Sequence, residues 1–403
     1  MPYRLRTVRT PEEYASAMSA IGHYFGWTPQ EEDVDRFSPL MPFDRLHAVF
    51  DDGQVVGGAG VFPFPMTVPG GTLPCAGVSV VGVLPTHRRR GLLRRMMEAQ
   101  LREMRERDEP IAALWASEET IYGRFGYGLA SVGLHVDAEQ KRVSIRPGAS
   151  HDARLVSHDE ALDRFPRIYD RVARTRPGLV VRSRDWWQTR RLDDAPERRR
   201  GAGPLVRVLF EREGRPVGYA LYRLHQDGST VGDWKKTIRV SEAFGVDDDA
   251  TREVWRFLLE IDWVDRVAAF NLPLDHPLML LVDRVNHLNL AVWDALWLRL
   301  VDVPAALAGR SFAPGRVTIE VTADAQITDN LGAWTIQDGA VKAARRRPDV
   351  RLSVDALGSA FLGGFSFTQL AAAGRVAEAA RGGIARADAL FRTATQPWAA
   401  ETF

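Results

Sequence analysis

The sequence predicts an α/β protein with several domains, and three observations lead to this fold class. The chain has 403 residues, 45% of them hydrophobic and 26% charged, which is typical of a globular protein with about two to four domains. Short β-branched or apolar runs alternate with longer segments whose apolar residues recur every three or four positions. One strand–turn–helix pattern also occurs twice, at residues 78–99 and again at residues 240–261.

The first of these segments, residues 78–99, is the most informative part of the chain. Its valines between positions 78 and 83 favour a buried strand, which Pro85 ends. From Gly91 onward, apolar residues recur at helical spacing and charged residues occupy the opposite face. We expect this helix to end near residues 107–110.

The turn between this strand and this helix is suited to binding a phosphate group. A helix N-terminus offers unpaired N–H groups and a partial positive charge, and Gly91 lets the backbone approach an anion closely. The side chains that can add charge-assisted hydrogen bonds to phosphate are Arg88, Arg89, Arg90 and Arg94. We therefore expect a pyrophosphate to bind here. The alternative is a solvated basic turn before an ordinary surface helix.

A second buried strand is expected at residues 111–117, followed by a tight loop at residues 118–128. The loop contains three glycines and two tyrosines, which marks an unusual backbone path. Together the two strands, the basic turn and this loop form a constellation that can be compared with known families.

These residues resemble a known family of enzymes. Arg88–Leu93 resembles the Arg/Gln-x-x-Gly-x-Gly/Ala signature of acetyl-CoA-dependent GNAT N-acetyltransferases, although Leu93 stands where the signature has Gly or Ala. The strings PTHRRRGLLR and ASEETIYGRFGYG closely resemble the Eis (enhanced intracellular survival) family of aminoglycoside N-acetyltransferases. Residues 294–307, residues 355–364 and a final Phe403 are also similar to that family. The resemblance thus extends from about residue 55 to residue 403.

The resemblance implies a three-part α/β (α+β) chain. Two GNAT-like acetyltransferase domains would be followed by a sterol-carrier-protein-like C-terminal domain. We expect these domains at residues 1–150, 151–298 and 299–403. The resemblance also implies a homo-oligomer, a hexamer.

The resemblance further assigns residues to acetyl-CoA, the expected co-substrate. In a GNAT fold the strands before and after the phosphate-binding helix diverge, and pantetheine lies between them against the edge of the first strand. Gly82 in that strand suits a bulge or a close backbone approach. The residues expected to contact acetyl-CoA are Val81, Gly82, Val83, Arg88, Arg89, Arg90, Gly91, Leu92, Leu93, Arg94, Ser117 and Glu118.

Two residues are expected to move protons. A tyrosine hydroxyl near a thioester can protonate the leaving thiolate, and the resemblance assigns this general-acid role to Tyr122. It assigns the general-base role to the α-carboxylate of Phe403. The alternatives are a packed aromatic ring for Tyr122 and a frayed terminus for Phe403. Since the sequence shows no activated cysteine, we expect direct acetyl transfer.

The acceptor amine is expected near an aromatic cluster in the first domain. Phe25 and Trp27 precede acidic residues at 31–35, and aromatic faces beside carboxylates suit a polycationic amine. The alternative is a hydrophobic staple next to a solvated acidic helix.

The resemblance adds two acidic residues to the expected acceptor site, Asp294 and Glu401. It implies aminoglycosides, acetylated at several amines, or lysine side chains as acceptors. Thr402 departs from the family pattern at the penultimate position, which leaves the range of acceptors open.

The second strand–turn–helix, residues 240–261, differs from the first in its turn. It carries three aspartates at 247–249 where the first copy has three arginines, and no glycine opens its helix. Since three carboxylates would repel a pyrophosphate, we expect the central domain to have lost the cofactor. The alternatives are a chance likeness between two ordinary units and an acidic face used for acceptor binding or subunit packing.

Composition bounds the remaining function classes. A net charge of +1 gives no overall field that would favour nucleic acid or a membrane. Because Cys75 is the single cysteine, the chain cannot form an intramolecular disulfide or a thiolate metal cluster. We expect Cys75 to lie in the core, and we expect no metal cofactor. Residues 1–20 lack an apolar targeting segment, so a cytoplasmic location is expected. A non-catalytic CoA- or lipid-binding protein is the alternative function.

The remaining periodic segments complete the prediction. Helices are expected at residues 11–21, 159–174, 183–192, 250–263, 356–362, 367–373 and 377–392. Strands are expected at residues 46–50, 55–62, 206–210, 217–223, 237–244, 317–321, 333–336 and 350–354. Residues 393–403 show no helical pattern, as is typical of a segment that reaches another surface.

Overall fold

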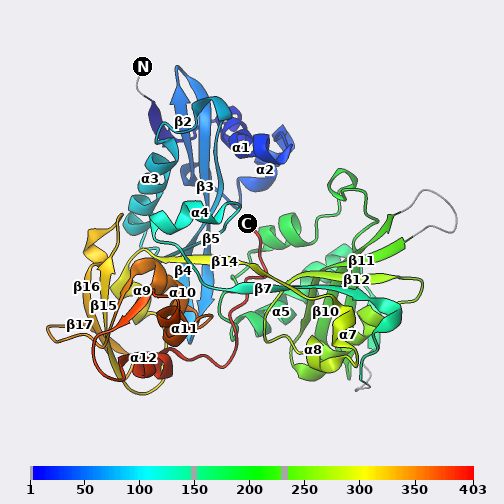
Figure 1. The fold of residues 1–403 in the computed structure, drawn as a ribbon. Helices are drawn as coiled ribbons and strands as arrows, with labels where there is room; N and C mark the ends of the chain where they lie inside the picture. The colour runs from blue at the N-terminus through cyan, green and yellow to red at the C-terminus, as the bar shows by residue number, and fades with distance from the viewer. Residues whose placement is uncertain (1–2, 147–151, 228–234) are drawn as a thin grey trace. The chain divides into compact units, whose positions relative to one another are not determined.

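A computed structural model describes residues 3–146, 152–227 and 235–403 (Figure 1). The chain divides into two compact units. The first unit consists of Met1–Ser131, Ala295–Pro397 and Glu401–Phe403. The second consists of Val132–Asp294 and Trp398–Ala400. The units are not consecutive in sequence. The expected domain boundaries remain predictions, and the first of them, at residue 150, lies outside the described residues.

The first unit is built around a mixed seven-stranded sheet with the strand order β1-β2-β3-β4-β5-β14-β6. Its strands are β1 (Arg4–Thr7), β2 (Leu46–Asp51), β3 (Gln54–Val68), β4 (Gly71–Val83), β5 (Ile111–Trp115), β14 (Leu296–Leu300) and β6 (Gly128–Leu129). Its helices are α1 (Pro11–Phe25), α2 (Glu31–Phe37), α3 (Leu92–Glu106) and α4 (Glu119–Tyr122). The helix expected after Gly91 is confirmed, and it ends at Glu106, one residue before the range of 107–110 expected for its end.

Helices α1 and α3 cover opposite faces of this sheet, on either side of β3 in Figure 1. Neighbouring residues of a strand point to opposite faces. A Cβ atom on Gly58 would lie 2.2 Å from the Ala17 carbonyl oxygen of α1, whereas one on Gly57 would lie 3.6 Å from Cε of Met96 in α3. Glycine at position 58 therefore lets α1 lie directly on the strand backbone.

The strands expected at residues 46–50 and 55–62 are confirmed as β2 and the first part of β3, and they form a hairpin. Asp52 and Gly53 have φ values of 46° and 84°, so two residues with positive φ join β2 to β3. This backbone matches the type I′ turn, for which an Asp-Gly pair is favoured.

Strands β4 and β5 pair in parallel over only three residues. The paired residues run from Cys75–Ile111 to Gly77–Ala113, and β4 then continues to Val83 while β5 continues to Trp115. The two strands thus diverge beyond Gly77 and Ala113. We call the region between Val78–Val83 of β4 and Leu114–Trp115 of β5 the first wedge.

The first unit also contains a five-stranded sheet with the order β17-β16-β15-β18-β19. Its strands are β15 (Arg316–Ala323), β16 (Gly332–Gln337), β17 (Ala340–Ala343), β18 (Val350–Ser353) and β19 (Val376–Glu378). Its helices are α9 (Val303–Ala308), α10 (Val354–Phe361), α11 (Phe367–Ala372) and α12 (Gly383–Phe391).

The helix predicted over residues 377–392 is wrong in its first half. Residues Val376–Glu378 form β19, which pairs antiparallel with β18 and leaves Val376 buried. Gly382 then adopts a left-handed backbone with φ 73° before α12 begins at Gly383. The alanine-rich composition suggested one long helix, but the strand pairing and the double glycine divide it.

The second unit has its own seven-stranded sheet, with the order β13-β7-β12-β11-β10-β9-β8. Its strands are β7 (Val132–Glu139), β8 (Asp152–Leu155), β9 (Val206–Arg212), β10 (Arg215–Asp227), β11 (Lys235–Gly245), β12 (Arg266–Leu272) and β13 (Ala291–Asp294). Its helices are α5 (His158–Ala173), α6 (Arg184–Trp186), α7 (Asp248–Glu260) and α8 (Leu278–Leu281).

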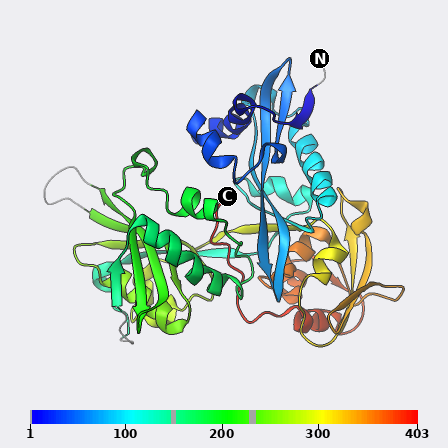
Figure 2. The ribbon, with the colours of Figure 1, turned by 180° about the vertical axis from the view of Figure 1, so that it is seen from behind.

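Helices α5 and α7 cover opposite faces of this second sheet. Helix α7 lies in front of the strands in Figure 1, and α5 lies in front of them in Figure 2. Tyr219 of β10 stacks on Phe165 of α5 with 4.4 Å between ring centroids. On the other face, Phe210 of β9 meets Phe257 of α7 edge to face at 5.4 Å. The sequence predicted α5, α7 and strands β9, β10 and β11, whereas β7, β8, β12 and β13 were not among the expected strands.

Two further findings concern function classes. Among the described residues, no helix is long and apolar enough to cross a membrane. In the same part of the chain, no group of three or more His, Cys, Asp or Glu side chains is arranged to hold a metal ion. Cys75 is buried, as expected, and burial raises the pKa of its thiol.

Candidate active site

The edge of the first wedge is shaped by a bulge in β4. Gly82 pairs with Gly58 and Ser79 with Gly60, so Val80 and Val81 face a single residue of β3. Val80 has a φ of 57°, an unusual value for a β-branched residue. The bulge therefore lies at Val80 and Val81. It turns the backbone of β4 at Val81, the first of the residues expected to contact acetyl-CoA.

Position 82 requires glycine because another backbone approaches it closely. The sequence predicted either this role or a bulge at Gly82. A Cβ atom there would lie 2.6 Å from the backbone nitrogen of Ile21 in α1, closer than real contacts allow. Tyr24, at the end of the same helix, donates its hydroxyl to the Val83 carbonyl at 2.7 Å. Helix α1 thus fixes the backbone at this end of β4, and the Val83 carbonyl already accepts a hydrogen bond from Tyr24 of that helix.

The N-terminus of α3 is open to a ligand. Gly91, in the left-handed region at φ 74°, is its N-cap residue and provides no side-chain cap. Arg89 just before it has a φ of 61°. Because a helix N-terminus carries unpaired N–H groups and a partial positive charge, this end of α3 is suited to binding an anion.

The arginines of the turn divide into two groups. Arg90 donates to the Tyr3 hydroxyl and, at 3.3 Å, to the Thr86 carbonyl, so it helps to hold the turn. Within the described residues Arg89 and Arg94 form no hydrogen bond or ion pair, and both are exposed. The latter two guanidinium groups are available for phosphate oxygens.

Tyr122 lies at the end of α4, in the loop after β5. Its side chain is only 6% exposed and belongs to the apolar cluster beneath the sheet. Burial raises the pKa of its hydroxyl to about 12, so the group keeps its proton at physiological pH. Within the described residues no hydrogen bond is formed by this hydroxyl. A protonated phenol without a competing partner can act as a proton donor.

A buried network holds the loop that carries Tyr122. Arg299 of β14 donates to the Phe125 carbonyl and to both carboxylate oxygens of Asp324 at 2.8 Å. Asn330 donates to the same carboxylate at 3.0 Å. A Cβ atom on Gly126 would lie 1.7 Å from Nη1 of Arg299, so glycine is required beside it. The network connects residues 324–330 of the first unit to this loop.

Replacing Arg299 with alanine is expected to destabilise the fold by about 3–5 kcal/mol, because it leaves a buried carboxylate without its cation. Burial alone would raise the pKa of Asp324, but the charge and hydrogen bonds of Arg299 outweigh burial and lower it. The depressed pKa stabilises the fold above the ordinary carboxyl pKa, and this contribution is lost as pH falls through the folded value. Urea unfolding at several pH values measures both effects.

The control for this prediction is Arg105→Ala. Arg105 pairs with Asp329 at 2.8 Å, but their side chains are 40% and 70% exposed. An exposed pair contributes at most about 1 kcal/mol. Equal destabilisation by both substitutions would contradict the role assigned to the buried pair.

Phe403 lies at the base of the first wedge. Its ring centroid is 5.1 Å from that of Phe64 in β3, in an edge-to-face contact. A Cβ atom on Gly77 would lie 3.2 Å from its Cε2 atom. Gly77 is the residue at which β4 and β5 stop pairing. The Trp115 indole at the end of β5 also donates to the Glu401 carbonyl at 2.6 Å.

The residues expected at the acceptor site lie in different surroundings. Phe25 and Trp27, at the end of α1, are 66% and 38% exposed. Glu401 is buried, with 1% of its surface exposed. Asp294 is the last residue of β13 and belongs to the second unit. Ser117 and Glu118 follow β5 directly and are exposed.

The turn of the second strand–turn–helix is closed to anions. Asp247 caps α7 by accepting a hydrogen bond from the Ala250 N–H at 2.8 Å, and it also pairs with Arg212. A carboxylate therefore occupies the end of α7 that corresponds to the open end of α3. The sequence prediction that this copy has lost the phosphate site rests on the same aspartates.

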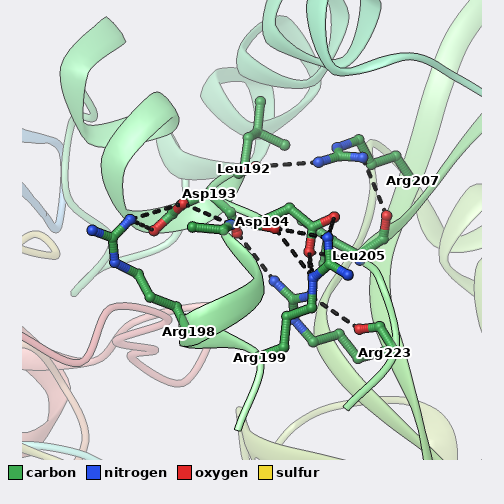
Figure 3. Close-up of polar contacts among 10 residues, drawn as sticks. Leu192, Asp193, Asp194, Arg198, Arg199, Leu205, Arg207 and Arg223 are labelled. Carbon is green, nitrogen blue, oxygen red and sulfur yellow. Dashed lines mark hydrogen bonds and ion pairs between the residues drawn. The ribbon is translucent and has the colours of Figure 1, made fainter. Parts of the chain in front are cut away.

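Another arginine-rich cluster, in the second unit, serves the fold (Figure 3). Asp194 accepts from Arg199 and from Arg223, and it also accepts the Leu205 N–H at 3.0 Å. Arg207 donates to the Leu192 carbonyl at 3.2 Å. Burial alone would raise the pKa of Asp194, but the arginines lower it. These guanidinium groups are directed at carboxylates and carbonyls of the protein itself.

Sequence reasoning missed several residues that shape the site. Tyr3 and Tyr24, which hold Arg90 and Val83, carry no motif. The bulge at Val80 gives no signal in a run of valines, since its positive φ is unusual for that residue. Arg299 in an apolar strand was the one available signal, because a buried arginine needs a buried partner.

Family comparisons agree with this architecture. Residues 4–130 match an acetyltransferase (GNAT) domain family, and residues 178–300 match a second acetyltransferase (GNAT) domain family. Residues 303–400 match a sterol carrier protein domain family. The chain therefore contains two GNAT domains followed by a sterol carrier protein domain.

Related proteins match over nearly the whole chain. An uncharacterized N-acetyltransferase from Streptomyces avermitilis is 40% identical over 395 residues, which cover 96% of this chain and 95% of that protein. The N-acetyltransferase Eis of Mycobacterium tuberculosis is 35% identical over 377 residues, covering 89% of this chain and 90% of Eis.

Solved structures extend this relationship. Eis1 from Mycobacterium abscessus superposes with a TM-score of 0.86 at 32% identity, covering 99% of this chain and 100% of that one. A GCN5-related N-acetyltransferase from Anabaena variabilis shares the fold, with a TM-score of 0.84 at 21% identity and full coverage of both chains. The GNAT domains make acetyl-CoA the co-substrate. The chain therefore belongs to the Eis family of GNAT N-acetyltransferases and is an acetyl-CoA-dependent acyltransferase.

Proposed function

We propose that the chain transfers the acetyl group of acetyl-CoA directly to a primary amine at the first wedge. Tyr122 acts as the general acid and the α-carboxylate of Phe403 as the general base. The observation that carries this proposal is the packing of Phe403 against Gly77, where β4 and β5 diverge. The open N-terminus of α3 supports it, because the pyrophosphate would bind at one end of the same wedge.

The proposed reaction balances its protons. The Phe403 carboxylate accepts a proton from the acceptor amine, directly or through a water molecule, as the nitrogen attacks the thioester carbon. Backbone N–H groups near Val81 stabilise the oxyanion. The C–S bond then breaks while the Tyr122 hydroxyl gives its proton to the sulfur. After the reaction the Phe403 carboxyl group holds one extra proton and Tyr122 lacks one. Proton exchange with water then returns both groups to their starting states.

The proposed acceptors are polyamine-like molecules such as aminoglycosides, acetylated at several positions, or lysine side chains. Exposed Phe25 and Trp27 offer aromatic faces to a cation. The first turn of α2 adds Glu31 and Glu32, which are exposed carboxylates. Asp294 and Glu401 remain part of the proposal as acidic residues of the acceptor site.

A thiol-release assay tests the proposed acceptor class. The protein is supplied with acetyl-CoA and a panel of aminoglycosides, polyamines and lysine peptides, and the acetylated products are located by mass spectrometry. Rapid release with polycationic amines and little release with neutral monoamines is the expected result. Equal rates with all primary amines would contradict a polycation-binding site.

Removing Arg89 or Arg94 is expected to raise the KM for acetyl-CoA about tenfold each, because each side chain can make a charge-assisted hydrogen bond to phosphate. The acceptor KM is expected to stay unchanged. Steady-state kinetics with alanine variants measures both. Arg102→Ala, further along the exposed face of α3, is the matched control and is expected to behave as wild type. A similar rise of the acetyl-CoA KM in all three variants would mean that the overall positive charge near α3, and not a contact of Arg89 or Arg94 with phosphate, governs binding.

The proposal includes a cytoplasmic homohexamer, as the family resemblance implies. Light scattering tests this part, with an expected molar mass near six times the 45.0 kDa of one chain.

A further inference from the structure

The second unit contains a wedge of its own. Strands β11 and β12 pair in parallel from Thr237–Arg266 to Val240–Ala269. Beyond these residues β11 continues to Gly245 and β12 continues to Leu272. This arrangement repeats that of β4 and β5 in the first unit. We call the region between Ser241–Gly245 and Phe270–Leu272 the second wedge.

Residues Trp398–Ala400 of the chain itself lie in the second wedge. The Trp398 ring stacks on Phe244 of β11, with 4.8 Å between centroids and 25° between planes. Its indole N–H donates to the Asn271 carbonyl of β12 at 2.7 Å. The Asn271 side chain in turn donates to the Ala399 carbonyl. Phe244 and Asn271 both follow the last parallel pair of their strands, so the segment sits between the diverging ends.

The main chain of this segment is held from three directions. The Trp398 N–H donates to the Pro177 carbonyl at 2.8 Å, and Arg191 donates to the Ala400 carbonyl at 3.3 Å. Asn271 takes part through both its main chain and its side chain, and it has a φ of 59°. A strained residue directed at a neighbouring carbonyl indicates a site shaped for this segment.

We propose that the second wedge is a peptide-binding site whose ligand is the chain's own segment Trp398–Ala400. An aromatic pocket combined with main-chain hydrogen bonds is a common way of recognising a peptide. The capped N-terminus of α7 supports this, because Asp247 occupies the position where a pyrophosphate would bind. The degenerate GNAT domain thus binds a peptide where its active counterpart would bind pantetheine.

Binding in the second wedge makes Trp398 and Asn271 positioning residues for the reaction. Chain termini are usually poorly ordered unless they are tied down. Phe403 follows Ala400 by three residues, and Glu401–Phe403 belong to the first unit. Anchoring at Trp398 therefore limits the positions that the Phe403 carboxylate can take. This consequence rests on the proposed role of Phe403, whereas the peptide site does not.

Peptide complementation tests the site. A chain ending at Pro397 is mixed with a synthetic peptide of residues 398–403, and binding is followed by calorimetry and activity by thiol release. We expect saturable binding and recovery of activity. The Trp398→Ala peptide is expected to bind at least tenfold more weakly. Failure of the wild-type peptide to bind a shortened chain that still melts cooperatively would overturn the proposal.

The same peptide with a C-terminal amide separates this inference from the proposed function. It is expected to bind as tightly as the free acid and to restore no activity. Equal recovery with the amide would refute the role of the Phe403 carboxylate while leaving the peptide site intact.

Full-length variants test the anchor if the shortened chain does not fold. Asn271→Gly keeps the positive φ accessible but removes the hydrogen bond to Ala399. We expect carboxypeptidase to release residues 401–403 at least tenfold faster from this variant than from wild type, and kcat to fall while the KM for acetyl-CoA stays unchanged. Trp263→Ala is the control, because Trp263 is 85% exposed in the same unit. Equal digestion of Asn271→Gly and wild type would overturn the anchoring role.

Discussion

A chain with one glycine appended after Phe403 is expected to turn over about 10²–10⁴-fold more slowly than wild type, the usual loss when a general base is removed. The added residue moves the free carboxylate by up to about 3.6 Å. The contacts of the Phe403 ring with Phe64 and Gly77 can persist, so the tail itself stays in place. The KM for acetyl-CoA is expected to stay unchanged, since the phosphate turn is untouched. Thiol release at saturating acceptor measures the effect.

Phe403→Leu is the matched control for this extension. It keeps a terminal carboxylate at the same position and replaces one apolar side chain with another. A small loss of kcat, below about tenfold, is expected from the weaker packing against Phe64. If the extended chain keeps the wild-type kcat, the carboxylate is not the base.

Tyr122→Phe is expected to lower kcat by about 10²–10⁴-fold, because it removes the proton donor for the leaving thiolate. The unfolding free energy is expected to change by less than about 1 kcal/mol, since the hydroxyl forms no hydrogen bond within the described residues. With a pKa of about 12, the hydroxyl of wild type stays protonated, so kcat is not expected to fall from its ionisation below about pH 11. Steady-state kinetics between pH 6 and 10.5 checks this.

Tyr127→Phe provides a control in the same loop. The two tyrosine rings lie 6.2 Å apart, and the buried Tyr127 hydroxyl has no hydrogen-bond partner in the part of the chain that the structure describes. Removing an unsatisfied buried hydroxyl is expected to leave stability equal or higher and to leave kcat near that of wild type. Similar losses in both variants would mean that the loop, and not the Tyr122 hydroxyl, governs the rate.

The raised pKa of Tyr122 also predicts how the stability of the fold changes at alkaline pH. In the unfolded chain Tyr122 ionises near its ordinary pKa of about 10, but in the folded chain only near 12. The unfolded state therefore loses its proton first as pH rises, and the free energy of unfolding falls from about pH 10 upward.

The strand–turn–helix of the proposed cofactor site was predictable because its signals are local. The valine run before Pro85 and the helical spacing after Gly91 each depend on residues close in sequence, and both elements appear where expected. The hairpin at Asp52 and Gly53 was predictable for the same reason. In these cases local propensity and the final fold agree.

The elements that sequence reasoning missed depend on distant partners. Strand β14, Leu296–Leu300, lies between β5 and β6, so it joins a sheet formed mostly by the first 130 residues. Its apolar sequence does not indicate which strands it pairs with. The break before Gly383 was missed because alanine content outweighed the two glycines and the pairing of β19 with β18.

The candidate site shows the same division. Motif and resemblance proposed the arginines and Tyr122 as site residues, but they could not separate the roles of the individual arginines in the turn. Arg90 holds Tyr3 while Arg89 and Arg94 remain available, and only the folded backbone separates these roles. The anchoring of Trp398 between β11 and β12 was also invisible, since the tail shows no periodic pattern.

We propose that the first wedge is the cofactor site and that Asp247 and Trp398 close the second wedge to acetyl-CoA. Calorimetric titration of the full-length protein with acetyl-CoA tests both statements at once. We expect one acetyl-CoA bound per chain and strongly weakened binding in the Arg89→Ala, Arg94→Ala double variant. Two acetyl-CoA molecules per chain, or unchanged affinity in the double variant, would contradict this proposal.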